Sequence, residues 1–141
     1  IFILKKELLK IPVFGWHLKK INSIPIERNI TTKENLSFFD NIIKTINKIK
    51  CPLIIFPQAT RVLPMERPSF KKGVSRIYKE LNIFCQPLAI NSGYVWPKKG
   101  LKISNKEITI SILKPINPNL TKEDFIKTLE KNIYSELDLL N

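Results

Sequence analysis

The chain has 141 residues, enough for one domain with a sizeable core, and its 43% hydrophobic fraction excludes a disordered polypeptide. Its formal net charge of +12 favours anionic partners: nucleic acid, acidic lipid surfaces, phosphorylated substrates or acidic carrier proteins. One histidine and two distant cysteines cannot supply a zinc site. The sequence also contains no run of about 18 apolar residues, the length that would indicate a membrane span.

The first part of the chain contains two short predicted strands with helical pieces between them. Ile1–Leu4 is wholly apolar and predicts a buried strand. A helical turn precedes Pro12, and a second helical piece covers Phe14–Ile21, in which we expect Trp16 to pack in the core. Ser23–Ile26 predicts another brief strand, so strand and helix alternate from the start.

A long amphipathic helix and a short apolar run occupy the middle of the chain. Thr31, with Glu34 three residues later, forms a capping-box signature, and apolar residues then recur at helical spacing as far as Lys50. Leu53–Phe56 has the wholly apolar character of a strand covered on both faces. Pro57 ends this strand because proline has no N–H to give to a sheet ladder.

The second half continues the alternation. A helix is predicted over Val74–Asn82, followed by a buried strand over Phe84–Ile90. Apolar and polar residues alternate in Ile108–Leu113, which predicts a half-exposed strand that joins the sheet, with an edge as one position for it. Thr121 with Asp124 marks the start of the last helix.

This order of elements predicts an α/β fold with a mostly parallel central sheet flanked by helices. No internal repeat, low-complexity tract or interdomain linker is apparent. We therefore expect residues 1–141 to form a single domain. The chain begins at an isoleucine inside a strand-like run, so we expect this domain to be truncated at its N-terminus.

Basic residues follow three of the predicted strands. Lys5 and Lys6 follow the first strand, Arg28 follows the second, and Thr60 and Arg61 follow the third. The carboxyl ends of parallel strands meet at one rim of a sheet, where open α/β sheets bind ligands. This arrangement predicts a phosphate site, since guanidinium donors match phosphate oxygens. An ordinary surface loop with one solvated arginine is the alternative interpretation of Arg61.

Five blocks also carry a family resemblance. Together they are similar to the 1-acylglycerol-3-phosphate acyltransferases, the PlsC-like lipid acyltransferases, in order and spacing over nearly the whole chain. The blocks are Lys5-Lys6-Glu7-Leu8 with Ile11-Pro12-Val13-Phe14-Gly15-Trp16, Ile24-Pro25-Ile26-Glu27-Arg28, Phe56-Pro57-Gln58-Ala59-Thr60-Arg61, Phe70-Lys71-Lys72-Gly73, and Gln86-Pro87-Leu88-Ala89-Ile90.

The resemblance implies a reaction. The family transfers an acyl chain from acyl-carrier protein or acyl-CoA to the free hydroxyl of 1-acylglycerol 3-phosphate (lysophosphatidic acid), giving phosphatidic acid for phospholipid biosynthesis. It also implies that no cofactor is bound. The expected location is the cytoplasmic face of a membrane, with peripheral attachment or an anchor in the missing N-terminal segment, and an anionic membrane surface as partner.

The resemblance also assigns residues to the site. Arg28 and Arg61 would bind the acceptor phosphate, with Thr60 beside Arg61 and help from Lys5 or Lys6. The surrounding motif loops would contain the remaining site residues. These are Glu27, Phe56, Pro57, Gln58 and Ala59. Apolar residues near Trp16 and Trp96 would be candidates to face acyl chains, with core packing the favoured interpretation of Trp16.

Three departures from the family pattern matter. The catalytic His-x4-Asp motif of the family is absent, and the only histidine, His17, has Asn22 five residues on. We expect that motif upstream of Ile1 and expect the 141-residue chain alone to be inactive. Gln58 replaces a usual glutamate. Ala59 replaces a usual glycine and would be strained if the turn needs a positive φ.

Two other functions remain open. A non-catalytic basic module that binds anionic membrane or nucleic acid is supported by the net charge, although no common RNA-binding motif is present. A non-catalytic relative that binds lysolipid is encouraged by the two replacements and by the missing catalytic motif.

Overall fold

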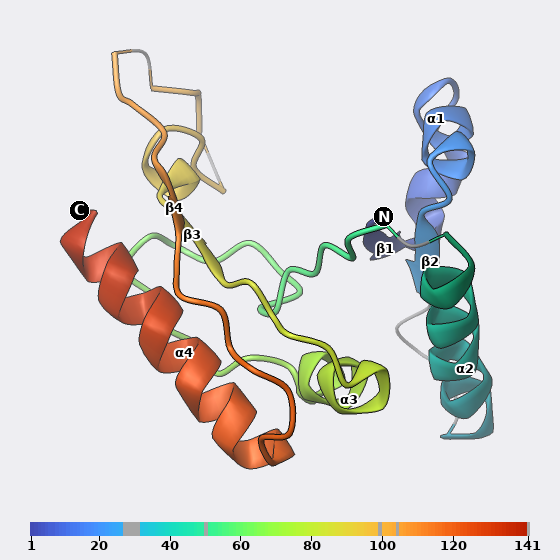
Figure 1. Ribbon diagram of the computed structural model, residues 1–141. Helices are drawn as coiled ribbons and strands as arrows, with labels where there is room; N and C mark the ends of the chain where they lie inside the picture. The colour runs from blue at the N-terminus through green and yellow to red at the C-terminus, as the bar shows by residue number, and fades with distance from the viewer. Residues whose placement is uncertain (27–31, 50, 99, 104, 141) are drawn as a thin grey trace. The chain divides into compact units, whose positions relative to one another are not determined.

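The structure is a computed structural model that describes residues 1–26, 32–49, 51–98, 100–103 and 105–140 (Figure 1). Glu27, Arg28 and the capping residue Thr31 lie outside the described residues. The chain divides into two compact units, Ile1–Ile55 and Phe56–Asn141, and each is described by itself. The expectation of a single domain stays a prediction.

A small parallel sheet organises the first unit. Strand β1 (Ile3–Lys5) pairs in parallel with β2 (Ile24–Ile26), and Phe2 forms an isolated parallel bridge with Ile54. The Ile54 amide donates to the Ile1 carbonyl oxygen at 2.8 Å. The predicted parallel pairing of the first two strands is therefore confirmed, although Ile3 and Leu4 are half-buried rather than buried.

A 3-10 helix and a short α-helix connect β1 to β2. The 3-10 helix η1 (Lys6–Lys10) contacts both strands and α1 (Phe14–Lys20), which confirms the two predicted helical pieces. Gly15 permits their close approach, because a Cβ there would lie 2.2 Å from the Leu9 carbonyl oxygen. Leu18 is buried on the same helix.

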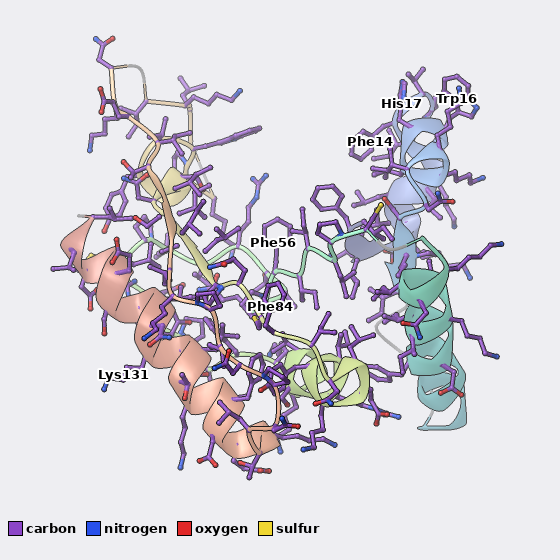
Figure 2. All side chains as sticks on the ribbon, in the orientation of Figure 1. Phe14, Trp16, His17, Phe56, Phe84 and Lys131 are labelled. Carbon is purple, nitrogen blue, oxygen red and sulfur yellow. The ribbon has the colours of Figure 1, made fainter. Side chains whose placement is uncertain are left out.

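Trp16 was expected in the core, and this expectation is wrong. Its side chain is 56% exposed, and Figure 2 shows Phe14, Trp16 and His17 projecting from α1. Gly15 and Leu18 occupy the buried face of this short helix, so Trp16 lies on another face. The third helix, α2 (Thr32–Ile49), confirms the long predicted helix.

The prediction of a buried strand over Leu53–Phe56 is also wrong. Among the described residues, the pairing of this segment is limited to a single bridge at Ile54. The Ile54 side chain is 40% exposed, and that of Phe56 is 66% exposed. Pro52 and Pro57 flank the run and have no N–H to extend a ladder in either direction. The apolar run is an extended segment without regular strand structure.

Two helices form the core of the second unit. Helix α3 (Lys72–Leu81) confirms the predicted helix and ends at Asn82, which is left-handed. Helix α4 (Lys122–Leu139) confirms the last predicted helix, and the Thr121 side chain caps it by accepting from the Asp124 amide at 3.0 Å. Tyr78 of α3 stacks on the fully buried Phe125 of α4, with ring centroids 3.8 Å apart.

The strands of the second unit form an antiparallel pair. Strand β3 (Leu88–Ile90) pairs with β4 (Ile110–Ile112), so the predicted strand at Ile108–Leu113 is confirmed at its centre. Figure 1 shows α4 beside these strands, and α4 contacts β3. Ala89 is fully buried, whereas Leu88 is 46% exposed on the other face.

The buried strand predicted over Phe84–Ile90 is therefore wrong in length and burial. Phe84 is 63% exposed, and Cys85 forms only an isolated bridge with Ile116 before β3 begins. Pro87 interrupts the run because it has no N–H for the ladder. Residues of β3 then alternate between a buried and an exposed face, as in a sheet covered on one side.

The second unit begins with a tight turn, Phe56 to Ala59. The Ala59 amide donates to the Phe56 carbonyl oxygen at 3.0 Å, with Pro57 in the second position of the turn, which proline favours. Ala59 has φ of 55°, in the left-handed region that favours glycine. The expected strain of an alanine at this position is confirmed.

We predict that Ala59→Gly raises the free energy of unfolding by about 0.5–1 kcal/mol. The left-handed conformation costs a residue with a Cβ about 1–2 kcal/mol, and the greater freedom of glycine in the unfolded chain offsets part of this gain. Urea unfolding of the purified chain measures the change. Ala89→Gly in β3 is the matched control and should be destabilising, because Ala89 is fully buried in a strand. A lower free energy of unfolding for Ala59→Gly would contradict the account.

Candidate functional site

The site residues predicted in the second unit lie in the tight turn from Phe56 to Ala59 and at the start of the loop that leads to helix α3. We call residues 57–71 the motif loop. Its start and end are joined, because the Lys71 amide donates to the Pro57 carbonyl oxygen at 2.9 Å. Lys71 is also the N-cap residue of α3. The motif loop is thus closed by a backbone bond at the start of a packed helix.

Tyr134 of α4 holds the motif loop from its side. Its hydroxyl accepts a hydrogen bond from the Gln58 side-chain amide at 3.3 Å and donates to the Pro68 carbonyl oxygen. Its ring packs against that of Phe70, with centroids 5.1 Å apart. One phenol therefore contacts both ends of the loop. Gln58, the residue that replaces the usual glutamate, takes part in this contact as a neutral donor.

Two acidic residues flank Tyr134 on the same helix and bind the loop as well. The Phe70 amide donates to Glu130 Oε1 at 2.5 Å. Arg67 forms an ion pair with Asp138 at 2.6 Å and donates to the Pro64 carbonyl oxygen at 2.5 Å. Glu130, Tyr134 and Asp138 recur every four residues, so they form one polar stripe along α4.

The sequence interpretation missed this polar stripe. It identified only the start of the last helix, at Thr121 and Asp124. The four-residue spacing of the three polar residues is readable in the sequence and places them on one helical face. The spacing alone does not identify the loop they bind.

The environment of Tyr134 raises the pKa of its phenol above the usual value. Burial is the main cause, and the nearby Glu130 carboxylate acts in the same direction. The hydrogen bond from Gln58 and the charge of Arg67 act against this rise in pKa. Tyr134 therefore stays protonated at neutral pH and keeps the hydrogen atom that it donates to Pro68.

Thr60 and Arg61 lie on the exposed side of the motif loop. The guanidinium carbon of Arg61 lies 5.5 Å from the centroid of the Trp96 ring, a cation–π distance. In the part of the chain that the structure describes, no carboxylate forms an ion pair with Arg61. Arg61 is thus an exposed arginine beside Trp96, and the alternative of an ordinary surface loop with one solvated arginine stays open.

The remaining predicted site residues belong to the first unit. Lys5 ends β1 and Lys6 begins η1, and both side chains are exposed. Glu27 and Arg28 lie outside the described residues. The convergence of Lys5, Arg28 and Arg61 on one phosphate stays a prediction.

Other kinds of site find little support among the described residues. No group of three or more His, Cys, Asp or Glu side chains there could hold a metal ion. No described helix is both long enough and apolar enough to cross a membrane. His17 is exposed, and its ring lies 5.2 Å from that of Trp16 in an edge-on arrangement.

Comparisons with known proteins relate this geometry to a family. The family model described as "Acyltransferase" matches residues 1–91, which include the motif loop and β3. A 1-acyl-sn-glycerol-3-phosphate acyltransferase of Pseudomonas aeruginosa is 31% identical over 101 residues, covering 70% of this chain and 38% of that protein. One of Streptococcus pneumoniae is 27% identical over 146 residues, covering 100% of this chain and 51% of that protein.

A solved structure shares the fold. The crystal structure of the 1-acyl-sn-glycerophosphate acyltransferase PlsC from Thermotoga maritima matches with a TM-score of 0.80 at 22% identity, over 99% of this chain and 56% of that one. The chain thus spans about half, or less, of the length of these relatives. The expected α/β fold class is confirmed. Because the family model covers well over half of its residues, the chain belongs to the acyltransferase family.

Proposed function

We propose that the intact protein containing this chain transfers an acyl chain to the free hydroxyl of 1-acylglycerol 3-phosphate. The hydroxyl oxygen attacks the carbonyl carbon of an acyl thioester, the C–S bond breaks, and the hydroxyl proton ends on the thiol. The products are phosphatidic acid and free acyl-carrier protein or coenzyme A. The family match together with the names of the relatives carries this proposal.

Arg61 is the described residue best suited to the acceptor phosphate. Its guanidinium is exposed on the motif loop, and no described carboxylate neutralises it. A guanidinium offers several N–H donors in a fixed plane, which match the oxygens of a phosphate monoester. In this proposal Thr60 adds a hydroxyl, and Arg28 with Lys5 or Lys6 adds further positive charge.

The proposal assigns the proton transfer to a residue outside this chain. The resemblance places a His-x4-Asp motif upstream of Ile1, and such a histidine would remove the hydroxyl proton while its aspartate fixes the tautomer. His17 is not assigned this role, because no aspartate lies at the required spacing. The chain contributes the acceptor site to a reaction centre completed by preceding residues.

The proposed reaction predicts a specific loss in Arg61 variants of the intact protein. Hydrogen bonds to charged groups contribute about 1.5–3 kcal/mol, so Arg61→Ala should lower kcat/KM for 1-acylglycerol 3-phosphate by roughly ten- to a hundredfold. Arg61→Lys should not fully restore it, because lysine lacks the planar fork. Steady-state kinetics with each substrate varied in turn measures both effects, with phosphatidic acid and free thiol quantified together.

Two controls make this kinetic test specific. The KM for the thioester should change much less than that for the acceptor, and Lys131→Ala, on α4, should leave both unchanged. An unchanged acceptor kcat/KM in Arg61→Ala would place the phosphate elsewhere. Absence of phosphatidic acid from the intact wild-type protein would reject the function itself and favour a lysolipid-binding relative or a basic module.

Helix α1 supports a further part of the proposal, attachment to the cytoplasmic face of an anionic membrane. Val13 is 71% exposed and Trp16 is 56% exposed, and Lys20 Nζ lies 3.7 Å from the Trp16 ring centroid. The sequence contains no acidic residue between Glu7 and Glu27. Exposed aromatic and apolar groups next to lysines are typical of segments that lie in a membrane interface.

We predict that the chain sediments with vesicles containing anionic phospholipid and that Trp16→Ala weakens this binding several-fold. The indole loses its place at the interface, while the lysines that attract the lipid head groups remain. Cosedimentation across a range of vesicle concentrations measures the affinity. Trp96→Ala is the matched control and should have a smaller effect. Equal binding to vesicles of neutral phosphatidylcholine alone would contradict the electrostatic part of this proposal.

A further inference from the structure

Two cationic side chains each lie at a cation–π distance from the ring of Trp96. The guanidinium carbon of Arg61 lies 5.5 Å from the ring centroid, and Lys102 Nζ lies 4.1 Å from it. The Trp96 side chain is 52% exposed, so this cluster lies at the surface of the second unit. Arg61 comes from the motif loop, whereas Trp96 and Lys102 come from the segment after β3.

Backbone hydrogen bonds hold Lys102 beside Trp96. The Ile103 amide donates to the Val95 carbonyl oxygen at 2.9 Å. This bond brings Lys102, which precedes Ile103, close to Trp96, which follows Val95. The Trp96 amide donates to the Ser92 carbonyl oxygen at 2.8 Å in the turn that follows β3. The path of the chain thus places the backbone of Lys102 close to Trp96.

The same segment is joined to the motif loop. The Tyr94 hydroxyl lies 3.1 Å from Met65 Sδ, in hydrogen-bonding geometry. Gly93 packs against Pro64, and a Cβ at Gly93 would lie 3.4 Å from the proline Cγ. Two contacts besides the Arg61–Trp96 pair therefore connect the segment after β3 to the loop that carries Arg61.

The cluster has no neutralising partner in the described part of the chain. Neither Arg61 nor Lys102 forms an ion pair or a side-chain hydrogen bond there. The nearest acidic residue along the motif loop, Glu66, accepts a hydrogen bond from the Leu63 amide at 2.8 Å. A cation–π contact depends on the ring quadrupole and leaves the N–H donors of both cations available to an anion.

We propose that Trp96 and Lys102 form, together with Arg61, one binding site for a phosphate monoester. The indole ring holds both cations close to it, Arg61 supplies planar donors, and Lys102 supplies a compact second charge. A phosphate monoester carries nearly two negative charges at neutral pH, so it matches two cations. One ligand with such a phosphate is the acceptor, 1-acylglycerol 3-phosphate, and this assignment rests on the proposed function. Coenzyme A, with its 3′-phosphate, is the other.

Trp96 itself reports binding. The chain has two tryptophans, so in a Trp16→Phe background the emission comes from Trp96 alone. We expect saturable changes in emission on titration with glycerol 3-phosphate, and none with glycerol at equal concentration. Lys102→Gln should weaken the binding about tenfold, the value of one charge-assisted hydrogen bond.

Lys131→Gln is the matched control, because it removes one positive charge from the same unit. Figure 2 shows Lys131 pointing outward from α4. It should leave the affinity within about twofold, as expected for an exposed charge outside the site. Equal weakening by Lys102→Gln and Lys131→Gln would mean a nonspecific effect of net charge and would overturn the proposal. A circular-dichroism spectrum of each variant verifies its fold.

Further titrations distinguish the two sources of the phosphate. If glycerol 3-phosphate binds and coenzyme A binds no more tightly than dephospho-coenzyme A, the site is one for the acceptor phosphate. Coenzyme A binding that is lost with dephospho-coenzyme A supports the donor. No response to either ligand would overturn the site. Acyl-transfer assays of the intact protein separate this outcome from the proposed function: phosphatidic acid formation with unchanged substrate kinetics in Lys102→Gln would reject the site alone.

Discussion

The arrangement of the second unit depends on how helix α4 holds the motif loop. This loop contains three prolines and belongs to no helix or strand, so regular backbone pairing does not fix it. Tyr134 contacts the loop at Gln58, Pro68 and Phe70 through its hydroxyl and its ring. The bond from Lys71 to Pro57 and the contacts of Glu130 and Asp138 hold the same loop, which carries Thr60 and Arg61.

Helix α4 performs this task because two of its faces have different roles. Phe125 and Leu129 are buried, and Phe125 attaches the helix to α3 through its stack on Tyr78. Glu130 and Tyr134 lie on the polar stripe that binds the loop. The family model matches only residues 1–91, so the residues that hold the motif loop lie outside the matched region. A site whose motif lies in one segment therefore depends on the packing of another.

Periodicity identified the helices correctly, whereas apolar runs overstated the strands. Three- and four-residue spacing is a local property, and it located α3 and α4 within a few residues. Strand length and burial depend on partners that a short run does not specify. Leu53–Phe56 retains one bridge between two prolines, and Pro87 shortens the strand before Ala89. The exposure of Trp16 likewise depends on which helical face finds a partner.

The sequence named candidate site residues, whose role stays a prediction, but not the contacts that support them. Arg61 and the strained Ala59 were identified from the sequence, and the φ of Ala59 confirms the strain. The bonds of Tyr134 and the contact between Arg61 and Trp96 join residues dozens of positions apart. No local pattern specifies such pairs, because they arise only when helices and loops have packed.

Nuclear magnetic resonance of the ¹⁵N-labelled chain tests most directly whether the motif loop binds phosphate. On titration with glycerol 3-phosphate, we expect saturable shifts of the Arg61 Nε–H, of the Trp96 indole N–H and of the amides of residues 58–61. The Trp16 indole N–H serves as an internal reference and should not move. Shifts confined to other lysines or to the Trp16 indole, with the Arg61 and Trp96 signals unchanged, would contradict the account.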